Sequence, residues 1–436
     1  MLKKKFDNFI DVVNKINTVY IEKWKYRPSS FIRIRKLPAK TLTLQILSNK
    51  GRTTKMELHD FYREYNLNGD VSVWGYEKRR LEFNPLMIHE MNSDFLKANY
   101  SDNDSLLKLN GYLVLAVDGS DIKVPATKEN YKKYGCQIRK NVSQENEPCM
   151  ASISCIYDCL NKYSLDCQIN KFKYSERDSA LSNVDNAKKI INNKAIYIFD
   201  RGYTSFDLMY KLKDDKFLFR IQKRHFTAEQ RDMKSDDELF TDVFRKERRM
   251  DRYAGNHEKI EQMRNNPVDL RFVRIHLDNG EDEFLVTNLT VDEFSTEAIG
   301  ELYHLRWNIE SSYRTMKSQM NLEEFSGYLS NIIEQDIYAC VIMYNLTIAN
   351  IQDNFLLEDE GRYRYKMQVN MNFSIGIIKS LFIKIILAKS KTERNRLNQE
   401  LKESINRYCL PIRENRTYKR KRNTKNKCSM GYKYSY

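Results

Sequence analysis

The chain has 436 residues, of which 41% are hydrophobic and 31% are charged; this excludes an intrinsically disordered protein and predicts a folded one with room for more than one domain. The formal charge is +15, from 74 lysines and arginines against 59 aspartates and glutamates, which indicates a polyanionic partner, most simply nucleic acid. The eight cysteines include no Cys-x-x-Cys pair, so we expect reduced structural thiols in a cytoplasmic protein.

Residues 1–110 are basic and mostly helical in pattern. Residues 53–66 begin with a threonine that can cap a helix, and a turn at Asn68-Gly69 follows. Residues 71–85 are predicted to form a second helix. A helix, a tight turn and a basic helix are the outline of a helix-turn-helix. We therefore predict that residues 1–110 are a helical DNA-binding region, whose contacts come from the cations of the second helix, Lys78, Arg79 and Arg80.

Residues 111–222 change to strand-like runs and are predicted to be the first part of an α/β core. Three strands, a helix, a strand, a helix and a strand follow one another, at 112–125, 149–161, 163–172, 176–191, 195–203, 204–215 and 216–222. This order resembles the ribonuclease-H-like fold, a mixed sheet covered by helices. The first and fourth strands are neighbours in that topology, so Asp118 and Asp200, which follow their apolar stretches, should approach each other.

Residues 223–292 are predicted to be a β-rich insertion that interrupts this core. Two strands around an Asn-Gly turn are expected within residues 271–289. The core should then resume at residues 293–355, which contain an apolar helix at 337–351.

Residues 356–436 are predicted to be a C-terminal helical region that ends in a basic tail. The most apolar stretch of the chain, residues 373–388, contains two lysines and is too short to cross a bilayer, so we expect an amphipathic helix and no membrane partner. No signal peptide is expected, since lysines follow Met1 without an apolar stretch.

The stretch YHLRWNIESSYRTMK, residues 303–317, is predicted to be one helix with a charged face. Four of its residues fall within about 60° of one another on a helical projection, namely Tyr303, Arg306, Glu310 and Lys317. The opposite side is apolar, with Leu305, Ile309 and Met316. One interpretation is a surface salt bridge. The other is a carboxylate that acts on a polyanion held by the cations. Trp307 flanks this face and belongs either to it or to the core.

Asp118, Asp200 and Glu310 together offer three hard oxygen ligands, which suit Mg²⁺ or Mn²⁺. Two such ions about 4 Å apart can catalyse phosphodiester displacement. Asp121 is a rival for the first ligand, but Asp118 is favoured because it directly follows the apolar run.

These residues resemble the signature of bacterial insertion-sequence transposases of the DDE superfamily. Tyr, two residues, Arg, three residues, Glu, six residues and Lys is the YREK pattern of the branch often called family four, and it is matched by Tyr303, Arg306, Glu310 and Lys317. The family's first two aspartates lie in DGS-like and DRGY-like turns, found here at residues 118–120 and 200–203. The resemblance spans roughly residue 37 to the C-terminus and also includes the β-rich insertion.

The resemblance implies a nucleoid-associated transposase that cuts and pastes its own insertion sequence. Asp118, Asp200 and Glu310 would be catalytic residues and ligands of two Mg²⁺ or Mn²⁺ ions, while Tyr303, Arg306 and Lys317 would hold the phosphates of the transposon end. Arg201, beside the second aspartate, is assigned to DNA binding as well. Hydrolysis would free a 3′-OH, a hairpin would form and reopen, and the end would attack target DNA. Pairing two ends of double-stranded DNA implies a homodimer.

One feature departs from the family, and two other functions stay open. Some relatives stack a flipped base on a tryptophan in the insertion, but the tryptophans here are Trp24, Trp74 and Trp307, so another aromatic would have to serve, such as Phe226, Tyr253 or Phe284. The alternatives are a transposase-derived DNA-binding protein without catalysis and another two-metal nuclease of the same fold.

Overall fold

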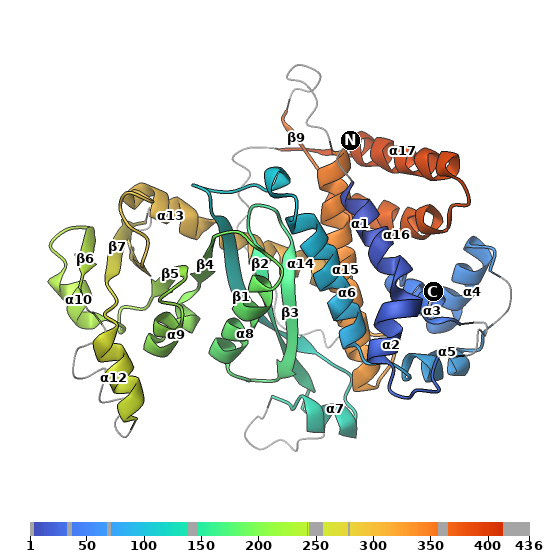
Figure 1. Cartoon of the computed structure of the whole chain (residues 1–436), viewed down its shortest axis with the longest axis horizontal. Helices are drawn as coiled ribbons and strands as arrows, with labels where there is room; N and C mark the ends of the chain where they lie inside the picture. Colours follow the sequence, from blue (N-terminus) through green and yellow to red (C-terminus); the bar gives the residue numbers. More distant parts are fainter. Residues whose placement is uncertain are drawn as a thin grey trace.

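The computed structural model describes residues 4–32, 37–67, 71–137, 147–241, 243, 256–277, 280–355 and 365–412. An eight-stranded mixed sheet runs through the molecule in the order β3-β2-β1-β4-β5-β8-β7-β6 (Figure 1). The strands are β1 Leu113–Lys123, β2 Met150–Asp158, β3 Ser164–Lys171, β4 Ala195–Phe199, β5 Lys216–Ile221, β6 Asp237–Phe240, β7 Leu270–His276 and β8 Asp282–Thr287.

The first five strands have the arrangement that the sequence predicted. β1, β2 and β3 are antiparallel neighbours, and β4 and β5 run parallel to β1. Residues 113–117 of β1 are all fully buried. A central strand covered on both faces needs such a continuous apolar run rather than an alternating one. The predicted adjacency of β1 and β4 is therefore confirmed.

The insertion adds strands to this same sheet. β8 pairs antiparallel with β5, and β7 and β6 continue outward from it. Among the described residues between β5 and β7 are the helices α10 Thr227–Asp232 and α12 His257–Asn265. The predicted hairpin is present as β7 and β8, while Asn279 of its expected turn lies outside the described residues. Residues 223–292 thus widen the sheet rather than forming a separate layer.

Helices cover both the sheet and its β3 edge. α8, Glu176–Lys188, packs on β1, β2 and β3, and α14, Trp307–Gln319, packs on β1. α15, Ser330–Asn354, contacts β3, the N-terminal helices α1, α3 and α6, and the C-terminal helices α16 and α17 (Figure 1). Of the residues in α15, 18 are buried, so this helix is the common core of all three parts of the chain.

The N-terminal region is helical, as expected. Its helices are α1 Lys5–Asn14, α2 Ile21–Trp24, α3 Ala39–Leu47, α4 Thr54–Glu64, α5 Val73–Arg80 and α6 Leu86–Tyr100, with a π-helical turn at Ile16–Tyr20. The predicted second helix is shorter than residues 71–85, because the chain leaves α5 at Leu81 and approaches Pro85 in a non-helical conformation. The expected turn at Asn68-Gly69 lies outside the described residues.

The remaining elements are short helices in the core and a C-terminal pair of helices. The short ones are α7 Lys128–Lys133, α9 Phe206–Lys211 and α13 Thr296–His304, with 3₁₀ turns at Asn103–Ser105 and Arg201–Tyr203. α16 Met371–Leu387 matches the predicted amphipathic helix, and α17 Lys391–Arg407 packs on it; β9 Met367–Gln368 pairs with β10 Leu410–Pro411. Within the described part of the chain, no helix is both long and apolar enough to traverse a bilayer. The basic tail from residue 413 lies outside it.

Candidate active site

The parallel pairing of β1 with β4 places two carboxylates side by side. The last paired residues are Val117 and Phe199, and the next residues along the two strands are Asp118 and Asp200. Asp118 does not end its strand, which corrects the prediction of a turn. β1 continues to Lys123 because β2 still pairs with it, with Asp118 opposite Cys155. Only the parallel neighbour β4 stops here.

Residues 303–317 do not form one helix, and this prediction was wrong. α13 ends at His304 and α14 begins at Trp307. Between them the backbone tightens: the amide of Leu305 donates to the carbonyl of Leu302 at 3.2 Å, and that of Arg306 to Tyr303 at 3.0 Å. These bonds span three residues instead of four, which rotates α14 relative to α13. A single helical projection therefore does not describe the YREK residues.

Tyr303, near the end of α13, and Arg306, at the break, both point inward. Tyr303 is 3% exposed and Arg306 is 5% exposed, so neither lies on an open helix face as expected. The Tyr303 hydroxyl donates to Asp200 Oδ1 at 3.3 Å. Arg306 Nη2 donates to Glu310 Oε1 at 2.7 Å. Both side chains thus bind the carboxylates of the site, and the salt bridge that the sequence left open is present.

The three carboxylates interact electrostatically. Burial raises the pKa of Asp118 to about 6; the Gly119 amide and Arg306 oppose this rise, and the charges of Asp200 and Glu310 add to it. Among the described residues, no three His, Cys, Asp or Glu side chains are grouped closely enough to hold a metal ion as they stand. Glu310 is instead bonded to Arg306.

Lys317 lies to one side of the carboxylate cluster and contacts the neighbouring part of β1. Its Nζ donates to the carbonyl of Asp121 at 2.7 Å and pairs with Glu323 at 3.2 Å. The Asp121 side chain is exposed and accepts a bond from the Ser152 hydroxyl at 2.6 Å. Successive residues of a strand point to opposite faces, so Asp121 points away from the face of Asp118. This arrangement favours Asp118 over Asp121 as the carboxylate of the cluster.

The flanking aromatic and cationic residues differ in exposure. Trp307 is 47% exposed and its ring lies 5.5 Å from the Arg306 guanidinium, so it is not a core residue. Arg201 is exposed at the start of the 3₁₀ turn that follows Asp200. Phe226 is buried against Phe206 and Phe272, whereas Phe284 is half-buried beneath Arg274. Tyr253 lies outside the described residues.

The three cations assigned to the second N-terminal helix have different surroundings. Lys78 is exposed and lies 4.8 Å from the ring of Trp74, which is itself 70% exposed. Arg79 pairs with Glu82 at 2.7 Å. Arg80 is fully buried and pairs with Asp336 of α15 at 2.8 Å, which corrects its assignment to DNA. Its guanidinium is paired inside the protein, where an approaching phosphate cannot reach it.

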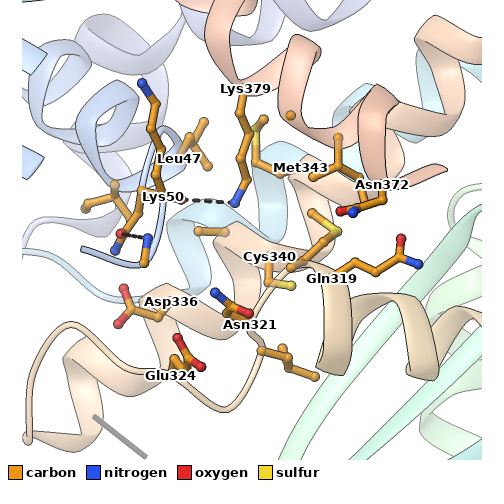
Figure 2. A pocket seen from close by; sticks show the side chains of 18 residues that line it. Leu47, Lys50, Gln319, Asn321, Glu324, Asp336, Cys340, Met343, Asn372 and Lys379 are labelled. Atoms are coloured by element: carbon orange, nitrogen blue, oxygen red, sulfur yellow. Dashed lines mark hydrogen bonds between the residues drawn. The ribbon is translucent and has the colours of Figure 1, made fainter. Parts of the chain in front are cut away.

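A cavity lies elsewhere, between α3, the α14–α15 connection, α15 and α16 (Figure 2). Its volume is about 330 Å³. Lys379 of α16 extends along it and donates to the carbonyl of Asn49 at 3.0 Å, and burial lowers the pKa of this lysine. The cavity contains none of the predicted catalytic residues, so its size alone does not make it the site of chemistry.

Comparison with known proteins identifies the family. The transposase DDE domain model matches residues 109–346, which is more than half of the chain. The chain belongs to the transposase DDE domain family. The matched range includes Asp118, Asp200, Glu310 and Lys317.

Individual relatives are more distant. A Synechocystis sp. protein named "Putative transposase for insertion sequence element IS4SA" is 32% identical over 103 residues, which is 20% of this chain and 30% of the relative. The chain therefore matches less than a third of that protein's length. A piggyBac transposase, solved in a synaptic complex with hairpin DNA, has a TM-score of 0.45 and 9% identity, covering 92% of this chain and 84% of that one.

Arg306→Ala should lower the stability of the protein, contrary to what a surface cation would do. Arg306 is buried, and its loss removes the cation that is bonded to Glu310 and interacts electrostatically with Asp118 and Asp200. We expect a decrease of about 1–3 kcal/mol in the free energy of unfolding, at the lower end because Glu310 is partly exposed. Lys317→Ala is the matched control and should change it by less than about 1 kcal/mol. Equal urea midpoints for the two variants would contradict the structural role of Arg306.

Proposed function

We propose that this chain is an active transposase of the YREK branch, which cuts its own insertion sequence out of DNA and inserts it elsewhere. One observation carries the proposal: neighbouring parallel strands hold Asp118 and Asp200 side by side, and α14 adds Glu310 to the same electrostatic cluster. A domain of the transposase DDE family surrounds this cluster.

The chemistry of the cluster fits divalent cations. Carboxylate oxygens are the ligands that Mg²⁺ and Mn²⁺ prefer, and a cation would relieve the repulsion that helps to raise the pKa of Asp118. Asp118, Asp200 and Glu310 would hold two ions, which when bound supply a Lewis acid and an activated water at the scissile phosphodiester. Glu310 is hydrogen-bonded to Arg306 in this structure, so binding the ions would require Glu310 to release Arg306.

The other YREK residues position the cluster and the substrate. The Tyr303 hydroxyl orients Asp200 through its hydrogen bond. Arg306 offsets the excess negative charge beside Asp118 and Asp200. Lys317, with a side chain 28% exposed, and Arg201 lie on the outside of the cluster, where they would neutralise phosphates of the transposon end.

The reaction begins with water attacking the phosphodiester at the transposon end, and the 3′ oxygen leaves. That 3′-OH attacks the opposite strand and gives a hairpin, which a second water reopens. The freed 3′-OH then attacks target DNA. No covalent protein intermediate is formed. Joining two ends in one event requires two active sites, which supports a homodimer on paired ends of double-stranded DNA.

Purified full-length protein with oligonucleotide duplexes tests this function. Inverted repeats that flank the gene supply the duplex sequence. With Mg²⁺ the protein should nick these duplexes at the repeat end, produce a hairpin on denaturing gels and join the 3′ end to a plasmid. Nicking without joining would instead favour another nuclease, and binding without nicking would favour a DNA-binding protein that has lost catalysis.

We also propose that the N-terminal region recognises the transposon ends through the exposed pair Trp74 and Lys78. Lys78→Ala should weaken binding severalfold and lower the salt slope of the binding constant by about 0.9, the value for one lost phosphate contact. Lys211→Ala, on α9 of the core with a side chain 48% exposed, is the control and should bind like wild type. Fluorescence anisotropy between 50 and 200 mM salt measures the affinity and the salt slope of both variants. An unchanged slope for Lys78→Ala would contradict the proposed contact between Lys78 and a phosphate.

A further inference from the structure

The face of the sheet that carries the carboxylate cluster continues onto β5. The last paired residue of β4 is Phe199, which lies level with Phe219 of β5. The next residues along the two strands are Asp200 and Arg220. Residues that lie level on neighbouring strands point to the same face of a sheet. Arg220 therefore projects beside Asp200, on the side of Asp118.

Glu283 of β8 is a further carboxylate on this face. Arg220 pairs with Leu285 across the antiparallel strands β5 and β8. Glu283 lies two residues from Leu285, so its side chain points to the same side as that of Arg220. Arg220 Nε is 2.9 Å from Glu283 Oε1, and the Glu283 side chain is 13% exposed. A largely buried ion pair thus extends the cluster toward β8.

Helix α13 packs on the same face and leads the chain to Arg306. Ile275 of β7 pairs with Glu283, and a β-carbon at Gly300 of α13 would lie 3.3 Å from the Ile275 side chain. α13 therefore sits directly on this part of the sheet, and Arg306 follows its last turn. Burial raises the pKa of Glu283, and the charge of Arg306 is among those that oppose this rise. Arg306 thus interacts with Glu283 as well as with Glu310.

Arg306 is incompletely bonded where it stands. Its Nη2 donates to Glu310 Oε1 at 2.7 Å, but its Nε is buried and has no hydrogen-bond partner among the described residues. A buried donor without an acceptor is unfavourable, because it has lost its bonds to water and gained none in return. A second acceptor within reach of Arg306 would therefore be favourable.

Binding of the proposed ions would make such an acceptor necessary. The three carboxylates of the cluster would hold the ions, and Glu310 would release Arg306 next to new positive charge. Glu283 lies on the same face but outside the proposed ion site. A carboxylate has two oxygens, and the ion pair with Arg220 engages Oε1. Glu283 can therefore accept from a second guanidinium without losing the first.

We propose that Glu283 is a positioning residue that takes the guanidinium of Arg306 when Glu310 releases it to bind the ions. One bond between a guanidinium and a carboxylate then replaces another, so freeing Glu310 does not leave a buried cation unpaired. The inference rests on the proposed function, because it uses the ion site proposed there. It concerns the protein and the ions alone, without DNA.

Urea unfolding of the full-length protein tests the exchange without ions. Glu310→Gln takes the charged partner away from Arg306, which should then rest on Glu283. Glu283→Gln should therefore lower the urea midpoint at least about twice as far in the Glu310→Gln protein as in wild type, since contacting residues are not additive. The loss of the Arg220 pair is common to both backgrounds. Asp282→Asn, next to Glu283 but on the opposite face, is the control and should have the same effect in both.

Mn²⁺ binding tests the exchange with ions. Electron paramagnetic resonance of free Mn²⁺ gives the affinity of the full-length protein in the absence of DNA. Glu283→Gln should bind Mn²⁺ about tenfold more weakly, the effect of one lost charge-assisted hydrogen bond at its lower end. Arg306→Ala should bind Mn²⁺ more tightly, because Glu310 is already free, and adding Glu283→Gln to it should make no further difference. Asp282→Asn should bind like wild type.

Three results would overturn the exchange. They are equal midpoint changes in the two backgrounds, an equal loss of Mn²⁺ affinity with and without Arg306, and undetectable Mn²⁺ binding by wild type. Either of the first two would reduce Glu283 to a structural partner of Arg220. The proposed function is decided separately, by cleavage of repeat-end duplexes. If wild type cuts no duplex but the coupling of Glu283 to Arg306 is found, the proposed function fails and the exchange stands.

Discussion

Asp118→Asn, Asp200→Asn and Glu310→Gln should each reduce cleavage of transposon-end DNA by at least about 10³-fold. Each change removes one negative charge from the cluster that we propose holds the ions, and metal-assisted stabilisation of a phosphoryl transition state is worth several kcal/mol, at 1.36 kcal/mol per tenfold in rate. Single-turnover cleavage of a labelled duplex at saturating protein measures the loss. Raising Mg²⁺ should not restore the rate.

DNA binding should survive the same changes, because none of the three carboxylates attracts a phosphate. Removing a negative charge beside the DNA should leave affinity equal or slightly stronger. The Asp118 variant should also gain stability, since a buried carboxyl whose pKa is raised to about 6 is held in an unfavourable environment when charged.

Asp121→Asn is the matched control, three residues along the same strand and exposed. It should cleave within severalfold of wild type. If Asp121→Asn abolished cleavage and Asp118→Asn did not, the first ligand would be Asp121, and the face of β1 that lies toward Arg306 and Glu310 of α14 would not be the catalytic one.

The carboxylate pair could be predicted from the sequence because its cause is local. An unbroken apolar run at residues 113–117 and another at 195–199 each give a buried strand, and the polar residue that follows each run is an aspartate. The order of strands and helices then made β1 and β4 neighbours. Each step depends on a few consecutive residues and on the known connectivity of α/β folds.

The positions of Tyr303 and Arg306 could not be predicted, because a helical projection assumes that the helix is continuous. No proline or glycine marks the break near Leu305, and three-residue hydrogen bonds leave no signature in the sequence. Tyr303 and Arg306 do contact carboxylates of the cluster, whereas Lys317 contacts the Asp121 carbonyl and Glu323. The projection was wrong about which of the YREK residues face solvent, since the burial of Arg306 depends on tertiary packing.

The widening of the sheet by the insertion has a similar explanation. The hairpin of β7 and β8 was visible as two apolar runs, but its partner is β5, about sixty residues earlier in the chain. Pairing between strands so far apart in the chain depends on tertiary packing of their side chains, so the local sequence carries little signal for it.

Arg80→Ala should lower the free energy of unfolding by about 3–5 kcal/mol, the cost of breaking a buried ion pair. Arg80 donates to Gln335 Oε1 and Asp336 Oδ1 of α15, each at 2.8 Å, and to the hydroxyl of Ser326. Its removal leaves Asp336, whose side chain is 11% exposed, without its positive partner. Lys78→Ala, two residues away and exposed, should leave stability within about 0.5 kcal/mol of wild type. Urea unfolding followed by circular dichroism distinguishes them.

The double variant Arg80→Met, Asp336→Leu separates the structural role of Arg80 from a DNA-binding one. Apolar residues of similar size can replace a buried ion pair at little cost, so the double variant should recover most of the stability lost by Arg80→Ala. If Arg80 only joins α5 to α15, the double variant should bind terminal-repeat DNA with wild-type affinity and an unchanged salt slope. A stable double variant that binds those ends at least tenfold more weakly would show instead that Arg80 reaches DNA through a rearrangement of α5, as its place beside Lys78 and Arg79 first indicated.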